Sequence, residues 1–401
     1  MIASIAEGET RIRNYSTGAD CHSSLNAMRA LGVPVEEAGT EVTIRGGGLD
    51  GLRQPPADLD AGNSGSTIRM LSGILAAQRF PTRIGGDDSL SRRPMGRIIE
   101  PLSRMGASIT ARDGRFPPLE IHGARLRPID YTLPVPSAQV KTCVLFAGLF
   151  AEGETIVHEP VRSRDHTEIA LREFGADLRV QGKTIALTGR PQLTGRDLVV
   201  PADLSSAAFF IVAALLLPGS RLAIRGVGLN PTRSTLLDFL AGMGASIRIT
   251  EVESRNGELT GELLVTHSCV GGGVIEKETT AALIDEIPVL AVLGAASENG
   301  LTIRDAAELR IKETDRIATI VENLRRMGVA ADELPDGLAI PGRQHFHAAE
   351  LDSFGDHRIA MAFTIAALCA DGDSVIRGAE AAAVSFPEFF ATLGRLQAQT
   401  S

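Results

Sequence analysis

The chain has 401 residues, a length that fits two or three domains and allows a large buried core. Its net charge is −9, from 40 Lys and Arg against 49 Asp and Glu, and this acidic balance argues against binding to nucleic acid or to a membrane surface. Aromatic residues make up only 4% of the chain and Trp is absent, so small aliphatic side chains must dominate the core.

The four cysteines lie far apart in the sequence and form no C-x-x-C pair. We therefore expect neither a disulfide framework nor a zinc site, and the spacing fits a reducing cytoplasm. No charged and then apolar leader opens the chain, and its longest apolar runs are too short to span a bilayer. We expect a cytoplasmic protein without membrane association and without a metal.

Six stretches of the chain share one pattern. A polar turn and an apolar helix precede a short strand that usually has a glycine at its start and an isoleucine within it, and a second helix closes the stretch. The strands begin at six anchors, where proline replaces glycine in the second: Gly8, Pro81, Gly153, Gly219, Gly300 and Gly372. These anchors are 73, 72, 66, 81 and 72 residues apart, which indicates an internal repeat.

The first repeat differs from the other five because its polar turn would fall before Met1. The later repeats start 14 to 18 residues before their anchors, at Asn63, Ser137, Ser205, Asp285 and Asp356. We therefore expect an incomplete first unit, with Met1 an internal methionine of a longer protein. The upstream segment should also supply a strand to the second domain.

Each repeat predicts one buried helix and one outer helix. Residues 207–217 are apolar on every side and must be enclosed by protein, whereas residues 169–175 show the apolar spacing of an amphipathic helix that ends in glycine. Three repeats would enclose three buried helices within sheets, twice over. The sequence therefore predicts an α/β fold with two repeat domains, residues 1–201 and 202–401.

The polar turns stand at the N-termini of the buried helices, where free backbone N–H groups attract anions. Capping by Asn, Ser and Asp would explain any single turn. It does not explain the charged groups in residues 91–95, 163–168, 312–316 and 356–358. Carboxylates, a lysine, a histidine and several arginines on such turns suit proton transfer beside a small polyanion.

Six of these motifs resemble those of the 5-enolpyruvylshikimate-3-phosphate synthase family. They are Asn63-Ser-Gly, Arg93-Pro-Met, Ser137-Ala-Gln, Ser163-Arg-Asp-His-Thr-Glu, Lys312-Glu-Thr-Asp-Arg and Gly355-Asp-His-Arg. The resemblance implies a two-domain inverse α/β barrel that transfers the enolpyruvyl group of phosphoenolpyruvate to the 5-hydroxyl of shikimate 3-phosphate and releases phosphate. It implies a step of aromatic amino-acid biosynthesis that glyphosate inhibits, with no cofactor, and we expect a monomer.

The resemblance also implies roles for individual residues. Asp285 and Glu313 would handle protons at the hydroxyl and at the phosphoenolpyruvate methylene. Phosphoenolpyruvate would be bound by Gly65, Arg93, Gln139, Arg316, His357 and Arg358. Shikimate 3-phosphate would be bound by Ser137, Ala138, Gln139, Arg164, Asp285 and Lys312.

The chain departs from the family in two places and leaves two alternatives open. The family's opening P-G-D-K-S-x-S-x-R turn is absent, and Ala383 and Val384 stand near a position where some members carry a lysine. One alternative is a truncated, catalytically impaired homologue that binds anions without turnover. The other is a UDP-N-acetylglucosamine enolpyruvyl transferase, which usually has a cysteine in a loop where residues 85–95 contain none.

Overall fold

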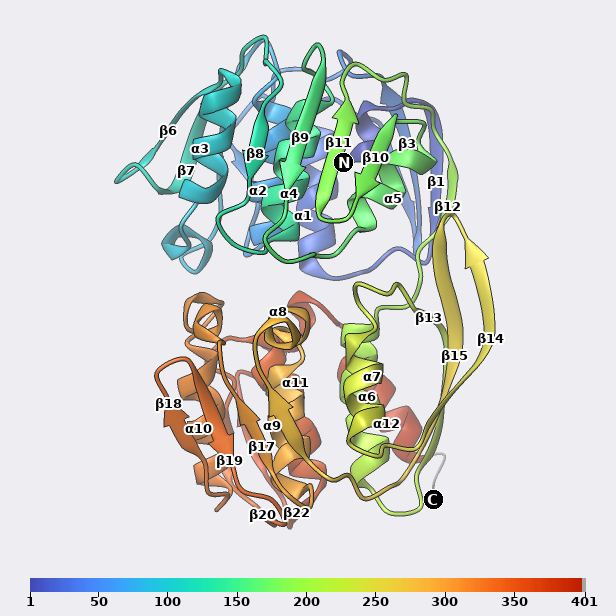
Figure 1. Ribbon diagram of the computed structural model, residues 1–401, viewed down its shortest axis with the longest axis vertical. Helices are drawn as coiled ribbons and strands as arrows, with labels where there is room; N and C mark the ends of the chain where they lie inside the picture. Colours follow the sequence, from blue (N-terminus) through green and yellow to red (C-terminus); the bar gives the residue numbers. More distant parts are fainter. Residues whose placement is uncertain (399–401) are drawn as a thin grey trace. The chain divides into compact units, whose positions relative to one another are not determined.

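The computed structural model describes residues 1–398 and divides into two compact units, Met1–Val200 and Pro201–Ser401. Each unit has its own hydrophobic core, because the two clusters of buried apolar side chains share no residue. In Figure 1 the colour changes along the chain, so each unit can be followed from its first element to its last. No helix within residues 1–398 has the length and hydropathy to span a membrane.

The first unit combines helices with short strands. Its helices are α1 (Ala19–Ala30), α2 (Gly65–Leu75), α3 (Gly96–Met105), α4 (Ala138–Gly148) and α5 (His166–Glu173), with 3-10 helices η1 (Ile2–Ile5) and η2 (Leu90–Arg92). Its strands are β1 (Glu7–Arg13), β2 (Val35–Ala38), β3 (Glu41–Gly47), β4 (Leu59–Asp60), β5 (Pro81–Gly85), β6 (Ser108–Arg112), β7 (Phe116–His122), β8 (Asp130–Thr132), β9 (Glu154–His158), β10 (Leu178–Gln181), β11 (Thr184–Thr188) and β12 (Asp197–Val199).

These strands form three four-stranded sheets with one shared topology. The strand orders are β12-β1-β3-β2, β4-β5-β7-β6 and β8-β9-β11-β10. In each sheet the first two strands are parallel and the other pairs are antiparallel. The repeated topology confirms the repeat that the sequence predicts in this half of the chain.

The second unit also combines helices with strands, and β13, β14 and β15 are its longest strands. Its helices are α6 (Leu204–Leu216), α7 (Thr235–Gly242), α8 (Glu278–Leu283), α9 (Ile287–Ala296), α10 (Arg316–Arg326), α11 (His357–Leu368) and α12 (Phe389–Ala398), with 3-10 helices η3 (Ala307–Ile311) and η4 (Ala379–Val384). Its strands are β13 (Arg221–Gly228), β14 (Ile247–Arg255), β15 (Glu258–Thr266), β16 (Gly273–Ile275), β17 (Leu301–Ile303), β18 (Asp332–Leu334), β19 (Gly337–Ile340), β20 (Phe346–His347), β21 (Glu350–Asp352), β22 (Ala370–Asp371) and β23 (Val375–Arg377).

Only one sheet of this unit repeats the four-stranded topology in full, in the order β16-β17-β19-β18. The sheet β13-β15-β14 has three strands, and an isolated parallel bridge joins Ala202 to Val227 of β13. The last repeat has two pairs of parallel strands, β20-β22 and β21-β23.

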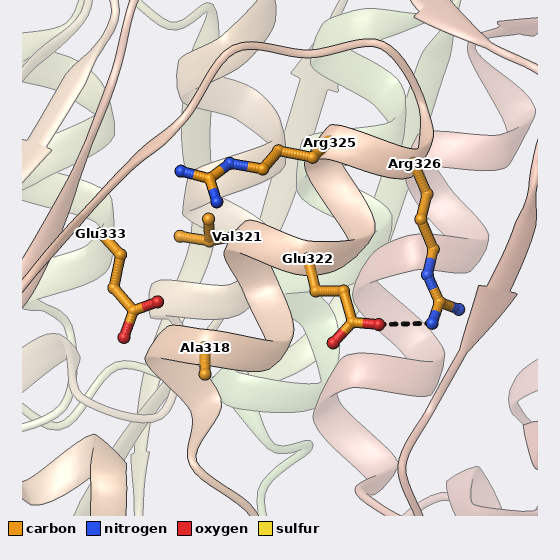
Figure 2. A pocket seen from close by; sticks show the side chains of 6 residues that line it. All are labelled: Ala318, Val321, Glu322, Arg325, Arg326 and Glu333. Atoms are coloured by element: carbon orange, nitrogen blue, oxygen red, sulfur yellow. Dashed lines mark hydrogen bonds and ion pairs between the residues drawn. The ribbon is translucent and has the colours of Figure 1, made fainter.

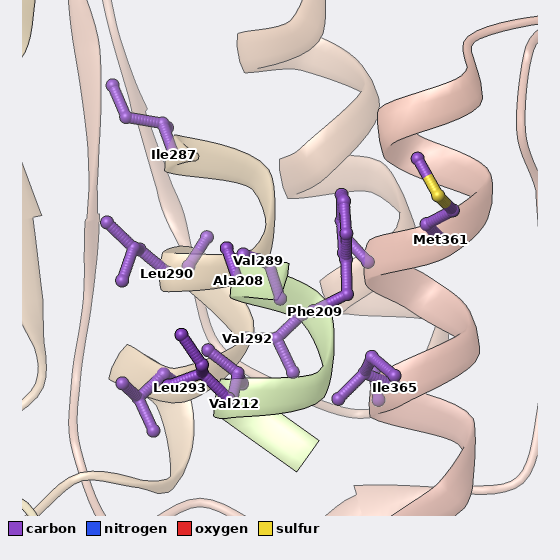
Figure 3. Close-up of a cluster of buried hydrophobic side chains, with 14 of the residues drawn as sticks. Ala208, Phe209, Val212, Ile287, Val289, Leu290, Val292, Leu293, Met361 and Ile365 are labelled. Carbon is purple, nitrogen blue, oxygen red and sulfur yellow. The ribbon is translucent and has the colours of Figure 1, made fainter. Parts of the chain in front are cut away.

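The predicted buried helices are confirmed as α2, α4, α6, α9 and α11, which are buried along most of their length. Figure 3 shows side chains of α6, α9 and α11 packed against one another, among them Phe209, Val292 and Ile365. Small residues allow such close packing. At Gly73 of α2, an added Cβ would lie 2.1 Å from the carbonyl oxygen of Cys143 in α4, so only glycine lets these backbones approach so closely.

The first repeat contains no helix comparable to these five. Before strand β1 the structure has only the 3-10 helix η1, in which Ala3, Ser4 and Ile5 are buried. The unit therefore encloses two buried helices, α2 and α4, which contact each other and lie behind β8 and β9 in Figure 1.

Candidate functional site

The polar turns lie at the N-termini of their helices, but in three cases the N-cap is not the residue at which the repeat starts. Ser137 and Asp356 are the N-caps of α4 and α11, as expected, and accept hydrogen bonds from the first turn. The caps of α2, α6 and α9 are instead Ser64, Asp203 and Glu286. The shift of one or two residues matters because it frees Ser205 and Asp285 for other contacts.

In the first unit, the turns before α2 and α4 are joined through side chains. Arg69 donates from Nη1 to Oε1 of Gln139 at 2.7 Å, and Gln139 donates from Nε2 to Ser66 Oγ at 2.8 Å. The amide of Gln139 therefore bridges the two helix N-termini. The sequence prediction included Gln139 but not Arg69, because no local pattern pairs residues that are 70 positions apart.

Arg93 and Gly65 lie beside this bridge. Arg93 is only 8% exposed and donates from Nη2 to Asn63 Oδ1 at 2.7 Å and to Ser89 Oγ at 3.2 Å. A Cβ added to Gly65 would lie 3.0 Å from Arg69 Nη1 and 3.4 Å from Arg93 Nη1. Two guanidinium groups thus converge on the backbone of Gly65, which is an arrangement that attracts anions.

The other predicted residues of this unit are Ser137, Ala138 and Arg164. Ser137 accepts a hydrogen bond from Val140 N at 3.3 Å, and Ala138 is the first residue of α4. Arg164 is half-buried in the loop between β9 and α5. All three therefore lie at the start of a helix or in the loop before one.

In the second unit, the predicted acid–base residues meet around Arg316, whose side chain is only 1% exposed. Arg316 donates from Nε to Asp356 Oδ2 at 2.7 Å and from Nη2 to Glu313 Oε2 at 2.6 Å, and its Nη1 lies 3.7 Å from Asp285 Oδ1. Lys312 Nζ lies 3.4 Å from the same oxygen of Asp285. One buried guanidinium thus holds three carboxylates together, including both predicted catalytic residues.

This concentration of charge shifts the pKa of the central groups. Burial disfavours the charged form of Arg316, but Asp356 and Glu313 outweigh burial and raise its pKa. Burial likewise acts to raise the pKa of Asp356, but attraction to Arg316 lowers it overall. Arg316 and Asp356 therefore form a permanently charged pair at neutral pH.

His357 and Arg358 follow Asp356 at the start of α11. Burial, reinforced by the charge of Arg358, lowers the pKa of His357 to about 4, so its imidazole is neutral at pH 7. Arg358 donates from Nη1 to Ser205 Oγ and to the carbonyl oxygen of Asp285, both at 2.8 Å. These bonds fix Arg358 beside Asp285.

Several contributors to this group were missed from the sequence. The sequence indicates Asp356 only as a helix start, whereas it binds Arg316 and accepts from Thr314 Oγ1 at 3.3 Å. Buried Glu286 binds Ser205 and lies 3.3 Å from Arg233. The signal that could have found Asp356 is its place in the same polar turn as His357, but no local pattern indicates Arg233.

A surface pocket with a volume of about 590 Å³ lies away from these residues, on the outer side of α10. Its lining is Ala318, Val321, Glu322, Arg325, Arg326 and Glu333 (Figure 2). Its arginines are already engaged, since Arg325 donates to the carbonyl oxygen of Ala331 and Arg326 to Glu322. The pocket contains none of the predicted site residues.

Among residues 1–398, no group of three His, Cys, Asp or Glu side chains could hold a metal ion.

Comparisons with known proteins agree with the motifs. Residues 1–393 match the sequence profile of the family described as EPSP synthase (3-phosphoshikimate 1-carboxyvinyltransferase). A 3-phosphoshikimate 1-carboxyvinyltransferase of Solibacter usitatus is 74% identical over 396 residues, which are 99% of this chain and 93% of the relative. One of Koribacter versatilis is 50% identical over 396 residues, 99% of this chain and 92% of the relative.

A solved structure shows the same fold. The EPSP synthase of Acinetobacter baumannii superimposes with a TM-score of 0.88 at 41% identity, and the match covers 99% of this chain and 92% of the other. This match confirms the predicted two-domain α/β fold.

Proposed function

This chain belongs to the EPSP synthase family, and we propose that it transfers the enolpyruvyl group of phosphoenolpyruvate to the 5-hydroxyl of shikimate 3-phosphate, with release of phosphate. The chain is then a 3-phosphoshikimate 1-carboxyvinyltransferase, which serves aromatic amino-acid biosynthesis. The observation that supports this function best is the arrangement of Asp285 and Glu313 around the buried Arg316.

The reaction is an addition followed by an elimination, and both steps move protons. In the addition, the hydroxyl oxygen bonds to C2 of phosphoenolpyruvate, the hydroxyl loses its proton and the C3 methylene gains one. In the elimination, the new methyl group loses a proton and the C2–phosphate bond breaks, which restores the double bond. Asp285 and Glu313 handle these protons, because two carboxylates held by one cation can alternate as acid and base.

The cationic and polar groups bind the two anions. Phosphoenolpyruvate is bound by Gly65, Arg93, Gln139, Arg316, His357 and Arg358. Shikimate 3-phosphate is bound by Ser137, Ala138, Gln139, Arg164, Asp285 and Lys312. The convergence of Arg69 and Arg93 on Gly65 supports the first assignment, and the cap of α4 supports the second.

The remaining expectations belong to the same proposal. The protein acts as a cytoplasmic monomer, with residues 1–201 and 202–401 as its two domains, and it needs no nucleic acid, metal or organic cofactor. Its net charge of −9 supports the absence of a nucleic-acid partner.

Phosphate release in the presence of phosphoenolpyruvate and shikimate 3-phosphate tests the function. Asp285→Asn and Glu313→Gln should each lower kcat by roughly 10²- to 10⁴-fold, the usual contribution of a general acid or base. Asp332→Asn, at an exposed position of β18, is the control and should leave kcat unchanged. Turnover only with UDP-N-acetylglucosamine would replace the proposed acceptor. Tight binding of shikimate 3-phosphate without turnover would favour the impaired homologue.

A further inference from the structure

The first unit contains a fully buried ion cluster that the proposed reaction does not use. It consists of Lys141, Glu159 and Glu168, which are 0%, 6% and 2% exposed. Lys141 Nζ lies 3.2 Å from Glu159 and 2.7 Å from Glu168 Oε1. One buried lysine thus forms ion pairs with two buried carboxylates.

The three residues come from three different elements. Lys141 lies in the first turn of α4, Glu159 directly follows β9 and Glu168 lies in α5. The loop between β9 and α5 is therefore attached to α4 at both of its ends. A second contact between α4 and α5 runs alongside, with Thr142 Oγ1 and Thr167 Oγ1 2.6 Å apart.

Glu159 extends the cluster into this loop. Its Oε1 accepts hydrogen bonds from both the backbone N–H and the hydroxyl of Ser163, the former at 3.0 Å. Ser163 directly precedes Arg164, which is assigned to shikimate 3-phosphate. A chain of contacts therefore runs from Lys141 through Glu159 to Ser163, the residue next to Arg164.

Stability alone does not account for this cluster. A buried ion pair often contributes less than an apolar group of similar volume, because desolvation offsets the attraction. Burial raises the pKa of Glu168 despite Lys141, and Glu168 Oε2 has no hydrogen-bond partner among the described residues. What the cluster does provide is a fixed geometry between α4 and the loop, which apolar contacts specify less sharply.

We propose that Lys141 is a positioning residue that holds the loop carrying Arg164 in register with the start of α4, where Ser137 and Ala138 lie. The proposal rests on the proposed function, because it treats these residues as the shikimate 3-phosphate contacts. Lys141 touches no substrate. Its role is to keep the partners of one substrate at a fixed spacing through Glu159 and Ser163.

Two variants test this proposal from opposite ends of the chain of contacts. Lys141→Met removes the charge and keeps the aliphatic length, and Ser163→Ala removes the hydroxyl contact while leaving all three buried ions in place. Both should raise KM for shikimate 3-phosphate about tenfold or more, with KM for phosphoenolpyruvate within about twofold of the wild type. Lys141→Arg should restore most of the lost affinity. Lys277→Met, an exposed change in the second unit, should leave both KM values unchanged.

A third variant separates positioning from stability. Lys141→Met/Glu168→Gln removes two of the buried charges, so it should recover much of any loss in Tm while KM for shikimate 3-phosphate stays high. Recovery of both quantities together, an equal rise of both KM values, or an unchanged KM in Ser163→Ala and Lys141→Met would overturn the proposal. A wild-type chain with no turnover of shikimate 3-phosphate would instead overturn the proposed function, so the two failures are distinguishable.

Discussion

At the scale of single residues, burial determines the charge state of His357. Its folded pKa of about 4 lies below its ordinary value of 6.5, because burial and nearby arginines oppose protonation. Between these two values the unfolded chain binds a proton that the folded chain does not. The contribution of His357 to stability is therefore complete above pH 6.5 and is lost as the pH falls towards 4, by about 3 kcal/mol in total.

Urea denaturation between pH 7.5 and 4.5 checks this prediction. The wild type should lose more stability on acidification than His357→Gln, which has no imidazole to protonate. His345→Gln, in an exposed loop, should keep the wild-type slope. Equal slopes in all three proteins would contradict the burial argument.

Gly65 provides a second residue-scale prediction, because the space around it is limited by flexible guanidinium groups. In Gly65→Ala the new Cβ would lie 3.0 Å from Arg69 Nη1 and 3.4 Å from Arg93 Nη1, so both groups must shift by a few tenths of an ångström. Flexible arginine side chains can make such shifts with little loss of stability. The shifts would, however, move the guanidinium groups away from the positions proposed for binding the anion. We expect KM for phosphoenolpyruvate to rise several-fold while Tm changes little. Gly96→Ala, in open space at the start of α3, should leave KM unchanged.

At the scale of elements, helix α2 depends on Gly73 for its contact with α4. A Cβ at this position would lie 2.1 Å from the rigid carbonyl oxygen of Cys143, so Gly73→Ala should destabilise the first unit by about 3 kcal/mol. Gly242→Ala, in α7 with nothing nearby, should be neutral or slightly stabilising. Urea denaturation of the two variants makes the comparison, and equal stabilities would show that the helices can separate without cost.

The same elements show how far the sequence predicts the structure. Runs of apolar residues predict the buried helices correctly, because a helix that is apolar on all sides must be enclosed. The starts of the repeats locate the helix caps only to within one or two residues. The caps are Ser64 next to Asn63 and Asp203 two residues before Ser205, because nearby polar residues compete for one backbone position.

Contacts between distant residues are the part that the sequence does not predict. Arg316 and Asp356 are 40 residues apart, and Arg69 and Gln139 are 70 apart, so their meeting depends on how complete helices pack. The motif Lys312 to Arg316 indicates charge chemistry but not its partner. Lys141 illustrates the limit most clearly, because a lysine in a polar turn suggests a ligand contact, whereas it is fully buried against two glutamates.

At the scale of the whole molecule, the two units have separate cores, with buried apolar residues from Ala3 to Leu193 in one and from Leu204 to Leu393 in the other. A packing defect in one core should therefore increase local opening in that unit first. We expect Gly73→Ala to accelerate amide hydrogen exchange mainly within residues 1–200. Gly294→Ala, whose Cβ would lie 2.4 Å from Leu301 Cβ, should accelerate it mainly within residues 201–398. If either variant accelerates exchange equally in both units, the cores unfold as one cooperative structure. If each variant accelerates exchange mainly in its own unit, the two units fold separately.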